Sequence, residues 1–149
     1  METKVQKEFV YYGYGFPVKF KNVAMVKVRD IWTPKVPYNR IAKELLRFLA
    51  RKPTRLTGNE VRFIRQSYEM TLDVFGKRFD VSHVAVLKWE KSKDTATSMA
   101  WSMEKDLRLF VLVREGAKAP ALASLYGELE SVPASKGAVI ELDAEGKAA

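Results

Sequence analysis

The sequence predicts an α+β protein that is mainly α, because strand-like and helix-like patterns occupy different parts of the chain. Apolar and basic residues alternate between positions 18 and 29, which is typical of half-buried strands. Apolar residues then recur every three or four positions from 38 to 114, which is typical of amphipathic helices. After residue 114 the composition shifts to Ala, Gly, Ser and Pro. We expect a small β unit, then helices, then a loose acidic tail.

These patterns divide the 149 residues into four parts. Residues 1–37 form the small β unit, and residues 38–53 form a connecting helix. Residues 54–114 form a helical domain, and residues 115–149 form a C-terminal helix and an acidic tail. A chain of this length can hold one ordinary domain or two small ones.

Composition excludes several kinds of chemistry. The chain has no cysteine and one histidine, so disulfides and thiolate zinc sites are ruled out, and we expect no metal and no other cofactor. It shows no phosphate-binding loop, nucleophile elbow or paired carboxylate motif, so we do not expect an enzyme. No segment approaches the roughly 18 apolar residues of a membrane helix, and the start lacks a signal-peptide core. We therefore expect no membrane contact and a cytoplasmic location.

Charge is unevenly distributed along the chain. Residues 1–50 carry 10 Lys/Arg against 4 Asp/Glu, residues 51–93 carry 10 against 5, and residues 94–149 carry 6 against 9. The net charges are thus +6, +5 and −3. A basic front indicates an anionic partner, usually nucleic acid, although solvated basic surfaces are also common.

The β unit contains two alternating runs on either side of Asn22, which we place in a turn. Val18 and Phe20 are predicted to face inward in the first run, and Val26 and Val28 in the second. The neighbouring lysines would then face water.

Two helices follow the β unit. Ile41, Leu45 and Leu49 recur every four residues, so the connecting helix is amphipathic and ends before Pro53. A capping box then begins at Thr57, whose hydroxyl and backbone pair with the backbone and carboxylate of Glu60. The next helix should therefore run from residue 58 to about 68.

The following two helices meet across a very short turn. Thr71 can cap a helix that stops at Asp80, and Ser82 can cap another that runs through Trp89. Gly76 lies inside the first helix, where a small residue allows close approach. This is the helix-turn-helix arrangement, whose second helix enters the DNA major groove with its first residues against the base edges.

The exposed side of that second helix supplies the predicted base contacts. His83 can donate to phosphate or guanine, Val84 can touch a thymine methyl group, and Lys88 can bind guanine O6 or N7. His83 can alternatively be an ordinary solvated side chain. The full predicted set of base contacts is Ser82, His83, Val84, Leu87 and Lys88.

Basic and polar residues around the motif supply predicted phosphate contacts, which dominate affinity but carry no base information. Each of them can alternatively be a solvated surface group, and only their concentration around one motif favours the contact. The predicted set is Arg55, Arg62, Arg65, Thr71, Lys77, Arg78 and Lys91.

The stretch from Leu56 to Lys91 resembles the Cro/repressor-type helix-turn-helix. Its beginning, "LTGNEVRFIR", is similar to the DNA-binding domain of MqsA-like antitoxins. The resemblance implies a five-helix domain. The chain departs from the family at Leu72, where glutamine is frequent, and in lacking the paired cysteines that bind zinc in those antitoxins.

Two functions from different classes follow. The first is a sequence-specific regulator of transcription, a repressor or autoregulating antitoxin, that binds a palindromic operator in double-stranded DNA as a homodimer. The alternative is a protein-interaction module that neutralises a toxin partner, with DNA binding secondary or lost.

Overall fold

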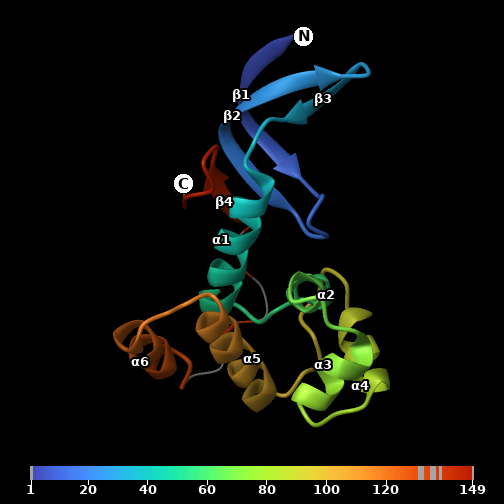
Figure 1. Cartoon of the computed structure of the whole chain (residues 1–149), viewed down its shortest axis with the longest axis vertical. Coiled ribbons are helices and arrows are strands. Elements are labelled where there is room, and N and C mark those ends of the chain that lie inside the picture. The colour runs from blue at the N-terminus through green and yellow to red at the C-terminus, as the bar shows by residue number, and fades with distance from the viewer. Residues whose placement is uncertain (1, 131–132, 135–136, 138, 149) are drawn as a thin grey trace. The chain divides into compact units, whose positions relative to one another are not determined.

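The computed structural model describes residues 2–130, 133–134, 137 and 139–148. Within them it contains six α-helices and four β-strands, which confirms an α+β fold that is mainly α (Figure 1). The chain forms two compact units. We call them the sheet unit, residues 1–45 and 138–149, and the helical unit, residues 46–137.

The sheet unit is organised around one central strand. β2 (Val18–Val28) pairs antiparallel with β1 (Thr3–Tyr11) along one edge. Its other edge is shared by β3 (Ile31–Pro34), which is antiparallel, and β4 (Ile140–Asp143), which is parallel. Arg29 at φ 50° and Asp30 at φ 63° make the β2–β3 turn, and two left-handed residues are what a two-residue hairpin loop needs.

The core of the sheet unit begins as predicted. Val18 and Phe20 are fully buried, and so are Ile41 and Leu45 of helix α1 (Tyr38–Arg51). The connecting helix is therefore confirmed, with its apolar stripe inside.

The second half of β2 departs from the prediction. Asn22 has a φ of 50° but lies within a continuous strand, not in a turn between two strands. The buried alternation changes phase there, because Val23 and Met25 are the next buried residues. Val26 is only partly buried and Val28 is exposed, so their predicted inward orientation was wrong.

The loose C-terminal tail is also corrected. Residues 140–143 pair with the first half of β2, and Ile140 and Leu142 are buried. The Asp143 carboxylate accepts the backbone N–H groups of Glu145 and Lys147, each at 2.9 Å, and so closes the turn after the strand. Those backbone hydrogen bonds, the one from Lys147 first, lower the pKa of Asp143.

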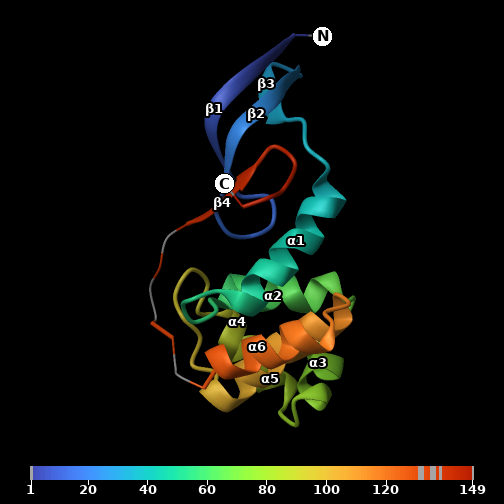
Figure 2. The same cartoon turned by 90° about the vertical axis from the view of Figure 1, so that its left-hand side faces the viewer.

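The helical unit contains the second half of α1 and five further helices (Figure 2). Their bounds are α2 (Gly58–Ser67), α3 (Leu72–Arg78), α4 (His83–Glu90), α5 (Trp101–Arg114) and α6 (Ala119–Glu128). The predicted domain at 54–114 thus holds four helices and not five, and α6 packs beside α5. None of the described helices combines the length and apolar character that crossing a membrane requires.

Candidate nucleic-acid interface

Two side-chain caps begin the helices of the α3–α4 pair, residues 72–90. The Thr71 hydroxyl accepts the backbone N–H of Val74 at 3.1 Å, and the Ser82 hydroxyl accepts that of Ala85 at 3.2 Å. Both caps were predicted, and each satisfies an N–H that has no partner inside its helix. Thr71 is therefore occupied as a cap, although it remains exposed.

The turn between α3 and α4 depends on two special backbone positions. Asp80 has a φ of 57°, the left-handed conformation that Asp tolerates better than most residues. The chain then folds back, so that the Val81 N–H donates to the Gly76 carbonyl at 2.9 Å. A Cβ atom on Gly76 would lie 2.6 Å from the Val81 carbonyl oxygen. Glycine is thus required by the returning turn.

Aromatic residues hold the inner faces of both helices. Phe75, Phe79, Val86 and Trp89 are buried. The Phe75 and Phe79 rings lie 4.9 Å apart, and Phe79 meets Phe110 of α5 edge-on at 6.1 Å. The orientation of α4 about its axis is consequently fixed by packing.

The opposite face of α4 is open to solvent. All five predicted base-contact residues are exposed: Ser82, His83, Val84, Leu87 and Lys88. Four of them have the spacing i, i+1, i+4, i+5, which places them on one side of a helix. The Val84 side chain is 60% exposed, so the fold gains little from its apolar character. The structure therefore brings this predicted set together on one surface.

Arg65 does not belong to the phosphate-contact set. Its Nε donates to Glu90 at 2.7 Å and its Nη2 to the other carboxylate oxygen at 3.0 Å. Its Nη1 donates to the Met70 carbonyl at 2.8 Å. This two-pronged pair, with the Arg65 side chain only 12% exposed, ties α2 to the last turn of α4. The predicted phosphate contact is corrected to a structural role.

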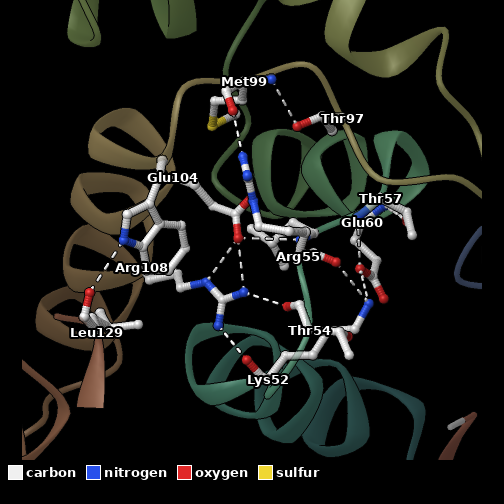
Figure 3. Close-up of polar contacts among 12 residues, drawn as sticks. Lys52, Thr54, Arg55, Thr57, Glu60, Thr97, Met99, Glu104, Arg108 and Leu129 are labelled. Carbon is white, nitrogen blue, oxygen red and sulfur yellow. Dashed lines mark hydrogen bonds and ion pairs between the residues drawn. The ribbon is translucent and has the colours of Figure 1, made fainter. Parts of the chain in front are cut away.

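Arg55 is likewise withdrawn. Its Nε donates to the buried Glu104 carboxylate at 2.8 Å, and its Nη2 donates to the Met99 carbonyl (Figure 3). The Trp101 ring lies 5.5 Å from the guanidinium carbon. These two hydrogen bonds and the ring contact hold the Arg55 guanidinium within the helical unit.

A buried cluster that the sequence analysis missed surrounds this arginine. Glu104 and Arg108 are fully buried one helical turn apart on α5, where Arg108 donates to Glu104 at 2.8 and 3.2 Å. Arg108 also donates to the carbonyls of Lys52 and Thr54 (Figure 3). Burial lowers the pKa of Arg108, and the Glu104 carboxylate opposes that effect. The i,i+4 spacing was a visible signal, but the same spacing is common on solvated helix faces.

The remaining predicted cations lie at the surface around the α3–α4 pair. Lys77 pairs with Asp73 at 3.1 Å, and Arg78 pairs with Asp106 at 3.2 Å. Both pairs are exposed and therefore weak, so they leave these cations exchangeable.

Arg62 and Lys91 are exposed, and they share a shallow pocket of about 360 Å³ between α2 and α4. The lining also holds Arg65 and Lys93, the second of which the sequence analysis did not single out. The Glu90 carboxylate in this pocket is already bound by Arg65. Apart from Arg65, the pocket therefore presents three basic side chains beside the end of α4.

Comparison with known proteins adds no relative: no family model matches the chain, and no curated protein or solved structure matches it significantly. The Cro/repressor resemblance accordingly stays an expectation that residues 56–91 carry. The geometry itself defines a short helix with a packed inner face, an uncommitted outer face and basic residues at its end.

Proposed function

We propose that the helical unit is a sequence-specific DNA-binding module of a cytoplasmic transcriptional regulator, a repressor or autoregulating antitoxin. The observation that carries the proposal is the outer face of α4, a helix fixed by packing, where four exposed side chains lie together just after the Ser82 cap: His83, Val84, Leu87 and Lys88. The major groove of B-DNA is wide enough to admit an α-helix.

The side chains of α4 match the chemistry of base edges. Lys88 donates to the O6 or N7 acceptors of guanine, and the exposed Val84 side chain contacts a thymine methyl group. His83 occupies the first position of α4, where its ring N–H reaches a phosphate or a guanine acceptor. Specificity in this proposal comes from α4 alone.

The pocket cations supply sequence-independent affinity. Arg62, Lys91 and Lys93 lie on the α2–α4 side, and Lys77 and Arg78 lie at the end of α3. Each such side chain that neutralises a phosphate releases counterions, so binding should weaken steeply with salt.

Two copies of the chain would bind a palindromic operator, with half-sites about one helical turn, or about 34 Å, apart. The experiment is binding-site selection from random double-stranded DNA with the full chain, run beside a selection with the Lys88→Ala variant. We expect the parent to enrich a palindrome, and the variant to lose the preference at one position in each half-site.

Failure of the parent to enrich any sequence would contradict the proposal. It would instead favour the interaction-module hypothesis, in which the chain acts by binding a toxin protein.

A further inference from the structure

A second pocket of the helical unit lies outside the candidate nucleic-acid interface. Its volume is about 530 Å³, which is within the usual range for a small-molecule site. Lys52, Thr54 and Thr57 line it from the segment that leads into α2, and Asp94 and Thr95 line it from the segment after α4. None of its lining residues belongs to the candidate DNA contacts. We call it the threonine pocket.

The hydroxyl group of Thr54 has no partner in the part of the chain that the structure describes. The residue is only 5% exposed, and its backbone carbonyl accepts from Arg108. No described side-chain polar atom is both fully buried and without a hydrogen bond, so the unpaired hydroxyl must open onto the pocket that Thr54 lines. A polar group held this deep normally has a hydrogen-bond partner. That partner must come from solvent or from a ligand.

Two further hydrogen-bond donors line the threonine pocket. The Lys52 ammonium donates to a Glu60 carboxylate oxygen at 2.7 Å and to the Arg55 carbonyl at 3.3 Å (Figure 3). One of its three N–H groups is therefore left without a partner among the described residues. The Thr57 hydroxyl accepts the Glu60 N–H at 3.2 Å, and its own proton is donated to no described residue. Together with Thr54, the pocket thus offers three unused donors.

The charges beside these donors favour an anion. Three cations and two carboxylates form ion pairs next to the threonine pocket, each with a side chain at most 15% exposed: Lys52, Arg55, Arg108, Glu60 and Glu104. Three positive charges against two negative charges leave a net charge of +1 in this cluster. A nearby anion stabilises excess positive charge that is poorly hydrated. The start of α2, whose cap lines the pocket, adds the positive end of a helix dipole.

Asp94 limits which anion can bind. Its carboxylate is exposed, accepts from the Asn59 side chain at 2.9 Å, and forms no ion pair with Lys52. A carboxylate repels a bare anion but accepts a hydrogen bond from a hydroxyl group. A ligand of this pocket should therefore carry its charge near Lys52 and hydroxyl groups near Asp94. The three unused donors match the three terminal oxygens of a phosphate ester better than the two oxygens of a carboxylate.

We infer that the threonine pocket binds a small sugar phosphate. The phosphate group accepts from the ammonium of Lys52 and the hydroxyls of Thr54 and Thr57, and a sugar hydroxyl donates to Asp94. This inference goes beyond the proposed DNA binding and does not rest on it, because no candidate DNA contact lines the pocket.

Isothermal titration calorimetry of the full chain without DNA tests the site, with ribose 5-phosphate as the probe. We expect a dissociation constant below about 1 mM. Inorganic phosphate lacks the sugar hydroxyls, and gluconate carries its hydroxyls on a carboxylate, so each should bind at least about tenfold more weakly.

Thr54→Val removes the hydroxyl while keeping the branched shape of the side chain. It should weaken ribose 5-phosphate binding at least about tenfold. The melting temperature should not fall, because no hydrogen bond within the described chain is lost. Thr33→Val, at a partly buried threonine of β3, is the matched control and should bind the probe as the parent does. Asp94→Asn should weaken binding of ribose 5-phosphate but not of inorganic phosphate, because only the first has a hydroxyl to donate.

A parent chain that does not bind ribose 5-phosphate at millimolar concentration would overturn the inference. Unchanged affinity in Thr54→Val would also overturn it, because the ligand would then lie elsewhere. Gluconate that binds as tightly as ribose 5-phosphate would contradict the assignment of the phosphate group. DNA is absent from these measurements, so their outcome is separate from that of the operator selection.

Discussion

Two arginines on α2 have opposite environments although they lie three residues apart. Arg62 is exposed and lines the basic pocket. Arg65 instead donates hydrogen bonds to Glu90 and to the Met70 carbonyl. Removing one partner of a largely buried pair leaves the other charge without compensation. The two residues should therefore differ in what they control.

We predict that Arg65→Ala lowers the free energy of unfolding by about 3 kcal/mol, because Glu90 loses its partner. Arg62→Ala should change it by no more than about 0.5 kcal/mol, as an exposed substitution. Urea unfolding followed by circular dichroism measures both. Equal stability of the two variants would show that the Arg65–Glu90 pair is not structural.

The same comparison shows what the sequence could predict at the residue scale. The exposed face of α4 was predictable, because the Ser82 cap and the apolar positions after it fix the phase of the helix. The structural roles of Arg55 and Arg65 were not predictable, because their carboxylate partners lie 49 and 25 residues further along the chain. Nothing local to an arginine indicates which distant carboxylate folding will bring to it.

At the scale of elements, the helices of the helical unit were predictable and the sheet was less so. Caps and capping boxes are local, and they determined where α2, α3 and α4 begin. β4 pairs with a strand that lies more than a hundred residues earlier in the chain. No pattern in the sequence around β4 could therefore indicate which strand it pairs with. The phase change at Asn22 was equally hidden, because a left-handed Asn occurs both in turns and inside strands.

We predict that Gly76→Ala destabilises the protein by about 1 to 3 kcal/mol, because the new methyl group overlaps the Val81 carbonyl oxygen. Gly127→Ala is the matched control on α6, where a Cβ meets no atom within 4 Å. It should stabilise by up to about 1 kcal/mol through helix propensity. Melting temperatures that move in the same direction for both variants would contradict the proposed role of the turn.

At the scale of the molecule, the sheet unit is built from the two ends of the chain, residues 1–45 and 138–149. The candidate DNA contacts all lie in the helical unit. Ile140 and Leu142 are core residues, so removing the segment after Gly137 is not the neutral change that a loose tail would allow. The acidic character of this segment was visible in the sequence, but its pairing was not.

We predict that Leu142→Ala lowers the free energy of unfolding of the sheet unit by about 2 to 4 kcal/mol through loss of core packing. Glu141→Ala, on the opposite side of the same strand, removes only part-exposed pairs with Lys19 and Lys21 and should cost at most about 1 kcal/mol. Hydrogen exchange of β2 amides reports the stability of this unit directly. Unchanged protection in Leu142→Ala would mean that β4 contributes nothing to the sheet.

The central claim is that α4 distinguishes bases, and the decisive measurement is a titration of the selected operator and a scrambled duplex at several salt concentrations. Lys88→Ala should lose about 1 to 3 kcal/mol on the operator and little on the scrambled duplex. Arg62→Ala should weaken both duplexes alike and reduce the salt slope by about one unit. Lys118→Ala removes an exposed lysine just before α6, far along the chain from the α3–α4 pair, and should change neither. If Lys88→Ala binds both duplexes as the parent does, α4 is not the helix that contacts bases.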